Sequence, residues 1–165
     1  MKSFLKELNK FDDKTEVIIV SSCGGHLAQA LQFSESYTDY NYLFVMNDRT
    51  DLDHIMKNRT LFITHAERNL KQFLNIFEAF MIMLKLRPKV IFSLGAAPAL
   101  VFCIIGKFFG VKTIFIESFS RVSKPSLTGR LIYYFADDFY IQWPSLKKFF
   151  PKAKDFGGLL WYLSL

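Results

Sequence analysis

Cysteine and histidine are scarce in this chain of 165 residues. The two cysteines, Cys23 and Cys103, are too few for a disulfide framework, and a reducing compartment would keep both as thiols. The three histidines, His26, His54 and His65, show none of the spacings of a zinc site. We therefore expect neither a disulfide nor a metal site.

Long apolar runs are also missing. A membrane-spanning helix needs about 20 mostly apolar residues. Residues 70–86 are interrupted by three charged side chains, and residues 96–109 are too few and contain Lys107. The first 14 residues have too little apolar length for a signal peptide, so we expect the chain to stay in the cytosol.

What the chain does have is apolar and basic character. Its hydrophobic fraction is 51%, with 19 Phe, and its formal charge is +6. Such an apolar excess must be buried or must face lipid or protein. Basic residues with exposed aromatic rings suit an anionic membrane surface, whereas no zinc-finger spacing, aromatic RNP pattern or basic helical run indicates nucleic acid. We expect peripheral attachment to the cytoplasmic face of the cell membrane.

Short β-branched runs alternate with longer helical patterns, which predicts an α/β fold. We expect a single Rossmann-like domain over residues 1–165, with a parallel sheet of about six strands and helices on both faces. The predicted strands are 16–21, 42–46, 60–63, 90–94, 113–117 and 138–141. The predicted helices are 25–37, 51–57, 69–86, 97–109, 124–135 and 145–150.

The predicted helix 69–86 has an unusually wide apolar face. At helical spacing its core stripe would be Leu70, Phe73, Leu74, Phe77, Met81 and Leu84. Ile76, Phe80 and Met83 widen that stripe to nearly half the circumference. Deep packing as a crossover helix is the first interpretation, and contact with lipid or a partner is the second.

The first strand leads into Ser22, Cys23, Gly24, Gly25 and His26 and then into a helix with Leu27, Ala30 and Leu31 on its core side. Glycines allow close backbone approach, and free amides at a helix N-terminus attract phosphate, so this turn suits a diphosphate. A tight turn without a ligand explains the two glycines about as well. His26 is placed to act as a general base or to hydrogen-bond a phosphate.

Two further turns fall on the same edge if the sheet is parallel. One contains Gly95 and Ala96, and the other contains Glu117, Ser118 and Arg121. We expect these residues to line one cleft and to meet hydroxyl or phosphate groups. Glu117 has a simpler alternative role, as a loop carboxylate paired with Arg121.

A pair of carboxylates, Asp51 and Asp53, spells the D-x-D of metal-dependent glycosyltransferases. It lies where a short helix is predicted to begin, and the helix dipole favours carboxylates there. We interpret these two carboxylates as residues of the first helical turn and not as metal ligands.

Taken in order, five segments resemble the bacterial capsule and exopolysaccharide proteins of the CpsF and PssD type. Those proteins are similar to the membrane-anchoring subunit of the eukaryotic UDP-N-acetylglucosamine transferase that adds the second sugar to the dolichol-linked oligosaccharide. The resemblance covers nearly the whole chain. The segments are SSCGGH (21–26), SLGAA (93–97), IESFSR (116–121), KPSLTGRL (124–131) and ADDFYIQW (136–143).

The resemblance implies a split GT-B glycosyltransferase whose two Rossmann-like domains are separate chains. This chain would be the N-terminal half, binding the membrane and a polyprenyl-diphosphate-linked sugar acceptor. A small partner subunit would bind the UDP-sugar, and without that partner this chain would be inactive. By that likeness Gly24, Gly25 and His26 would contact the acceptor, and Glu117 would lie in the inter-domain cleft. We expect His26 and Glu117 to be the catalytic residues, and Ser22 to help bind the diphosphate. The eukaryotic subunit has an N-terminal membrane helix, and we expect none in this chain, which would then attach peripherally or through its partner.

Residues 157–165 form an apolar tail after two glycines. Exposed, such a tail would be a liability. We expect Leu159, Leu160, Trp161 and Leu163 to dock on the catalytic partner, and packing on the chain's own domain is the alternative.

Two other functions remain open from the residues alone. A dehydrogenase-like enzyme would need G-x-G-x-x-G followed by an acidic residue, and the first turn lacks that spacing, so we expect no cofactor. A membrane scaffold or enhancer without its own ligand site would make the three small-residue turns accidental.

Overall fold

The computed structural model describes residues 1–47, 54–64, 72–95 and 97–155. Seven strands form one sheet in the order β3-β2-β1-β4-β5-β6-β7, and every neighbouring pair is parallel. The strands are β1 (Val17–Ser21), β2 (Tyr42–Met46), β3 (Thr60–Phe62), β4 (Val90–Ser93), β5 (Lys112–Ile116), β6 (Asp138–Ile141) and β7 (Lys154–Asp155). The sheet confirms the expected parallel Rossmann-like architecture.

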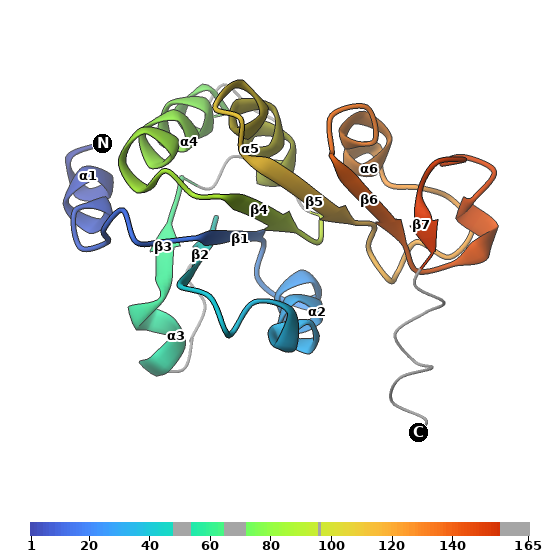
Figure 1. Ribbon diagram of the computed structural model, residues 1–165, viewed down its shortest axis with the longest axis horizontal. Coiled ribbons are helices and arrows are strands. Elements are labelled where there is room, and N and C mark those ends of the chain that lie inside the picture. The colour runs from blue at the N-terminus through green and yellow to red at the C-terminus, as the bar shows by residue number, and fades with distance from the viewer. Residues whose placement is uncertain (48–53, 65–71, 96, 156–165) are drawn as a thin grey trace.

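Helices lie on both sides of this sheet (Figure 1). The helices α4 (Gln72–Leu86), α5 (Ala97–Phe108) and α6 (Leu127–Ile132) cover the upper face in that view. On the lower side lie α2 (Gly25–Gln32) and α3 (His54–Asn58). The chain also has α1 (Lys2–Leu8) and two short 3-10 helices, η1 (Ser34–Ser36) and η2 (Pro144–Leu146).

Two apolar clusters follow from this layering. Alternate strand residues such as Ile18, Ile91 and Phe115 point up and are buried beneath α4 and α5. The opposite set, including Ile19 and Phe92, packs against α2 and the segment after it. The strands of a parallel sheet are apolar on both sides because helices bury both faces, which explains the continuous apolar runs in the sequence.

Helix α4 buries a different face from the one its periodicity predicts. Of the expected core stripe, Phe73, Leu74, Phe77 and Leu84 are exposed by 38 to 69%. The helix instead turns its other side inward, where the buried side chains are Asn75, Glu78, Ala79, Ile82, Met83 and Leu86. Two buried polar side chains are tolerated there because they hydrogen-bond to Thr64 and to each other. The prediction was therefore wrong for these four residues, whereas Met81 packs partly buried against the core and Leu70 lies outside the described residues. The second interpretation of the wide face gains support.

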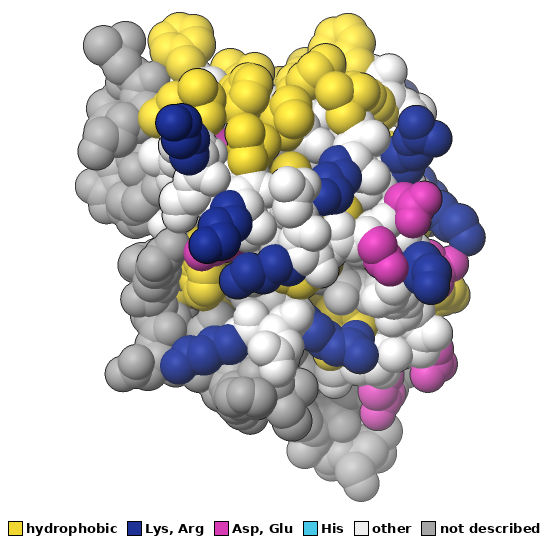
Figure 2. Space-filling view, turned by 90° about the vertical axis from the view of Figure 1, so that its left-hand side faces the viewer, with side chains coloured by type: hydrophobic (Ala, Val, Ile, Leu, Met, Phe, Trp, Pro, Cys, Tyr) yellow, Lys and Arg dark blue, Asp and Glu magenta, His cyan; other side chains and the backbone are white. Residues whose placement is uncertain are grey.

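Exposed apolar side chains of α4 continue onto the end of α5. The rings of Phe80 and Phe109 meet edge to face with centroids 5.4 Å apart, and Phe108 is 84% exposed. We call this surface the apolar crest; it consists of Phe73, Leu74, Ile76, Phe77, Phe80, Leu84, Phe108 and Phe109. Figure 2 shows hydrophobic side chains gathered along the top of the molecule, with Lys and Arg spread below them.

Several predicted bounds also need correction. Helix α2 ends at Gln32 rather than Tyr37, and Leu31 is exposed rather than in the core. The last predicted helix is reduced to η2, and α6 begins only at Leu127, after its N-cap Ser126. Helix α1 and strand β7 were not predicted. Within the described residues no helix combines the length and apolar character needed to cross a membrane.

Candidate functional site

The candidate site lies at the carboxyl edge of β1, β4 and β5. After β1 the backbone turns sharply at Gly24, whose φ of 81° lies in the region that favours glycine. Gly24 is the N-cap of α2, and no acidic side chain stands in the first turn of that helix. Gly24 and Gly25 are both exposed. The turn therefore presents helix N-terminal amides to solvent at the sheet edge, as a phosphate site requires.

His26 is held in a defined orientation within the first turn of α2. Its Nδ1 lies 2.9 Å from Ser22 Oγ. Burial, helped by the positive charge of Arg121, lowers the pKa of His26 below its ordinary 6.5. The imidazole is therefore mostly neutral at pH 7. When Nδ1–H donates to Ser22, Nε2 has a free lone pair and can accept a proton.

Gly95, in the turn after β4, touches the other side of that imidazole. Its φ is 107°, and a Cβ added there would lie 2.9 Å from His26 Nε2. Both the backbone angle and the close approach therefore require glycine. The predicted meeting of the first and fourth turns is present in the structure.

The turn after β5 supplies the third side of the site. Arg121 N donates to Ser118 O over 2.9 Å, and the hydroxyls of Ser118 and Ser120 lie 3.0 Å apart. Arg121 is exposed, and its charge acts on His26. Phe119 N donates to Gln29 Oε1 over 3.4 Å, which ties this turn to α2. This turn thus brings a guanidinium and hydroxyls to the sheet edge where the helix amides and the neutral imidazole lie, a set suited to an anionic, hydroxyl-bearing ligand.

Glu117, unlike Arg121, is not exposed to solvent. Its side chain is fully buried, and its oxygens accept hydrogen bonds from Ser118 and Ser126. Within the described residues its carboxylate makes no ion pair with Arg121, so that alternative is not what the structure has. The expected contact between Glu117 and a ligand would need a path to a covered carboxylate.

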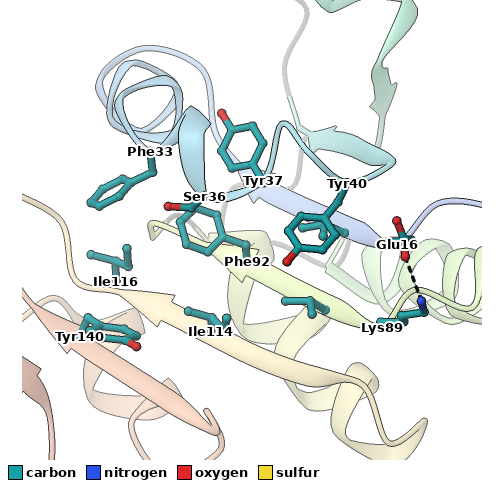
Figure 3. Close-up of a pocket in the computed structure, with 12 residues that line it drawn as sticks. Glu16, Phe33, Ser36, Tyr37, Tyr40, Lys89, Phe92, Ile114, Ile116 and Tyr140 are labelled. Carbon is teal, nitrogen blue, oxygen red and sulfur yellow. Dashed lines mark hydrogen bonds and ion pairs between the residues drawn. The ribbon is translucent and has the colours of Figure 1, made fainter.

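A cavity lined by aromatic side chains lies away from this site. It has a volume of about 370 Å³ and is lined on one side by Phe33, Tyr37 and Tyr40 and on the other by strand residues including Ile114 and Tyr140. Figure 3 shows these aromatic rings facing the sheet, with the Glu16–Lys89 ion pair at one end. None of the polar residues at the carboxyl edge lines it, so it is distinct from the candidate site.

Some predicted residues lie outside the described part of the chain. These are Ala96, the Asp51 and Asp53 pair, and the tail with Leu159, Leu160, Trp161 and Leu163. Their roles stay predictions.

A model of the family described as "Oligosaccharide biosynthesis protein Alg14 like" matches residues 1–159. The chain belongs to this family. The "UDP-N-acetylglucosamine transferase subunit ALG14" of Mus musculus is 21% identical over 183 residues, covering 90% of this chain and 84% of the mouse protein. The Schizosaccharomyces pombe protein with that description is 37% identical over 75 residues, which cover 42% of this chain and 36% of the yeast protein.

Solved structures show the same fold. The structure of Acinetobacter baumannii MurG superimposes with a TM-score of 0.63 at 14% identity, over 79% of this chain. The UDP-GlcNAc 2-epimerase of Methanocaldococcus jannaschii gives 0.64 at 12%, over 84% of this chain. The Alg14-like chain spans about two-fifths of the length of either, 42% in both cases. At these identities the likeness shows the fold alone.

Several contacts around the site of this Alg14-like chain were missed from the sequence. Gln29, Gln142 and Trp143 all bond to residues 117–119. Gly129 lies where a Cβ would come within 2.1 Å of Glu117 Oε2. A glycine inside a predicted helix was the one available signal, since an interior glycine weakens a helix and needs a packing reason.

Proposed function

We propose that this Alg14-like chain is the acceptor-binding, membrane-facing subunit of a two-component glycosyltransferase. It binds a polyprenyl-diphosphate-linked sugar, and a second small subunit brings the UDP-sugar. Catalysis requires both. The observation that carries this proposal is the convergence of the Gly24–Gly25 turn, His26, Gly95 and Arg121 at one sheet edge in a chain of this family.

The chemistry of the edge fits the acceptor better than the donor. The amides of α2 and the guanidinium of Arg121 suit a diphosphate. The neutral imidazole of His26 suits removal of a proton from the attacking sugar hydroxyl, because a general base must be unprotonated at the working pH. His26 is therefore the proposed catalytic base, with Ser22 orienting its ring.

The division of labour is supported by the relatives. The mouse and Schizosaccharomyces pombe proteins are each named as a subunit of a UDP-N-acetylglucosamine transferase. The donor site would lie on the second chain, which is why the donor sugar stays open. The tail residues Leu159, Leu160, Trp161 and Leu163 are proposed contacts with that chain.

The setting we propose is capsular or exopolysaccharide repeat-unit synthesis at the cytoplasmic face of the cell membrane. The resemblance to the CpsF and PssD proteins supports this. The apolar crest supports the membrane part, because an exposed apolar patch of this extent on a basic protein suits an anionic lipid surface.

The test is a reconstitution. The chain is purified alone and together with the sugar-nucleotide-binding protein encoded beside it, and radiolabelled sugar transfer from a panel of UDP-sugars to a membrane lipid extract is measured. We expect transfer only from the pair. His26→Ala in the pair should lower kcat at least about 100-fold, the usual contribution of a general base. The acidic limb of kcat/KM, which reports the enzyme without bound substrate, should fall below pH 6.5, because the pKa of His26 is lowered.

The matched control is Gln32→Ala, an exposed residue on the same helix as His26, which should leave transfer unchanged. Full transfer by the chain alone would refute the two-component proposal. Undiminished transfer by His26→Ala would refute the role of the imidazole and favour a scaffold without its own ligand site.

A further inference from the structure

The structure gives Glu117 a role that the sequence did not predict. This carboxylate follows β5 directly and is fully buried. Its Oε1 accepts a hydrogen bond from Ser118 N over 2.9 Å. Its Oε2 accepts two, from Ser126 N over 3.1 Å and from Ser126 Oγ over 3.0 Å. One side chain therefore holds both ends of the segment from 118 to 126.

The far end of that segment is fixed further by α6. Ser126 is the N-cap of α6, and its Oγ accepts from Gly129 N over 2.8 Å while donating to Glu117. A Cβ on Gly129 would lie 2.1 Å from Glu117 Oε2, so the first turn of the helix packs directly on the carboxylate. All the groups facing these oxygens are donors, which an ionised carboxylate satisfies and an amide does not.

The near end of the segment is tied to neighbouring elements. Gln142 Nε2 donates to the backbone oxygen of Glu117 over 2.9 Å, and Trp143 Nε1 donates to Phe119 O over 2.7 Å. The rings of Phe119 and Trp143 lie 4.9 Å apart. Phe119 N donates to Gln29 on α2, the helix whose first turn contains His26. The segment is therefore fastened to the element that carries the imidazole.

We propose that Glu117 is a positioning residue that holds the segment 118–126, and with it Ser118 and Arg121, in place beside His26. It does not contact the reacting atoms. Its two oxygens already accept hydrogen bonds from Ser118 and Ser126. If the carboxylate turned to meet a ligand, it would lose these hydrogen bonds and release both ends of the segment 118–126. Glu117 acts on the ligand only through the segment that it fastens.

Glu117→Gln tests this, because the amide nitrogen would face donors on whichever side it stands. The first measurement is hydrogen–deuterium exchange of the isolated chain and needs no partner or substrate. We expect amides of 118–126 to exchange at least about tenfold faster, while those of β1 keep their rate. Ser126→Ala should give a smaller change in the same residues, and the double variant should exchange no faster than Glu117→Gln alone. Glu35→Gln, at an exposed glutamate of η1, is the matched control.

The second measurement is transfer by the complete pair of subunits, and it rests on the function proposed above. We expect Glu117→Gln to raise KM for the lipid acceptor at least about tenfold, to lower kcat less than KM rises, and to leave the acidic limb of the pH profile where it is. Glu117→Asp should restore part of the change, since it returns an acceptor-only group.

Unchanged exchange in 118–126 would overturn the proposal whatever the activity shows. So would a loss of kcat of about 1000-fold with an unchanged KM and a vanished acidic limb, because that pattern belongs to a base. If Glu117→Gln does not fold, Ser126→Ala decides through the same exchange measurement. A failure of the two-subunit assay for the unmodified protein would instead count against the proposed function, and the exchange result would still stand.

Discussion

The two faces of the sheet differ in how completely their side chains are buried over β4, β5 and β6. On the upper face, Ile91, Phe115 and Phe139 lie fully or nearly fully buried beneath α5 and α6. On the lower face, their neighbours Val90, Ile114 and Tyr140 are only half-buried. The pattern in β6 alternates between buried and half-buried, as in a strand with one covered face.

This difference shows where the apolar excess of the chain goes. The upper helices close the core beneath them and direct a second apolar surface, the crest, to the outside. The lower face is closed by α2 and its neighbours over β1 and β2, and the cavity of about 370 Å³ remains beside them over β4 to β6. The site at the carboxyl edge lies between the upper and lower layers of helices. His26 belongs to α2 on the lower side, and the segment after Glu117 leads to α6 on the upper side.

The largest expected effect compares two isoleucines on adjacent strands. Ile91 faces the upper core, where its Cδ1 lies 2.2 Å from the position of a Cβ on Gly106, so there is no spare room. Ile91→Phe should lower the free energy of unfolding by about 1–3 kcal/mol through overpacking. Ile114 lines the lower cavity. Ile114→Phe should change that free energy by less than about 1 kcal/mol, because the larger side chain has space to enter.

Urea denaturation measures both values, and an unchanged m-value would show that the unfolded states are comparable. Equal losses for the two variants would mean that the lower face is as tightly packed as the upper one and would remove the contrast.

The second prediction concerns the crest. Phe73 is 69% exposed and Phe77 38%, one helical turn apart on α4. Replacing both with Ser should weaken binding to vesicles of phosphatidylglycerol and phosphatidylethanolamine at least about tenfold, since burying one Phe is worth about 1.5–3 kcal/mol. Co-sedimentation measures the binding.

Leu31→Ser is the control from the lower side, on α2, where Leu31 is 43% exposed. It should bind vesicles like the unmodified chain. An equal loss from Leu31→Ser would show that no particular face meets the lipid.

The strands were predictable because each is a short apolar run, and six of the seven lie within two residues of the expected bounds. Strand β7 was not, because Lys154 and Asp155 are charged, exposed and only two. The site's convergence was predictable from parallel topology alone, since turns at one edge must meet. The hydrogen bonds of Glu117 were not predictable, because its partner Ser126 lies nine residues away and only the folded chain brings them together.

The orientation of α4 shows a second limit. With apolar residues over nearly half the circumference, periodicity identifies the helix and leaves its inward side undetermined. Contacts decide it: Thr64 donates to Glu78 from both its N and its Oγ, and Asn75, with its amide turned to suit both neighbours, donates to Thr64 O and Glu78 Oε2. Two polar residues that look like a solvent face in the sequence are buried on the upper side.

The smallest expected effect comes from that buried carboxyl. Burial raises the pKa of Glu78 above its ordinary 4.5, although the hydrogen bonds from Thr64 oppose the rise. Between 4.5 and the raised pKa the folded chain holds a proton that the unfolded chain has released, so the contribution of Glu78 to stability falls as pH rises through that window. Glu78→Gln does not titrate. Urea midpoints measured from pH 4 to pH 8 should therefore move in favour of the variant as pH rises, relative to the unmodified chain.

Glu35→Gln, at an exposed site, should follow the unmodified chain at every pH. If the urea midpoints of Glu78→Gln and of the unmodified chain instead changed in parallel with pH, the carboxyl of Glu78 would titrate in the folded chain as it does in the unfolded chain. The proposed effect of its burial on stability would then be absent.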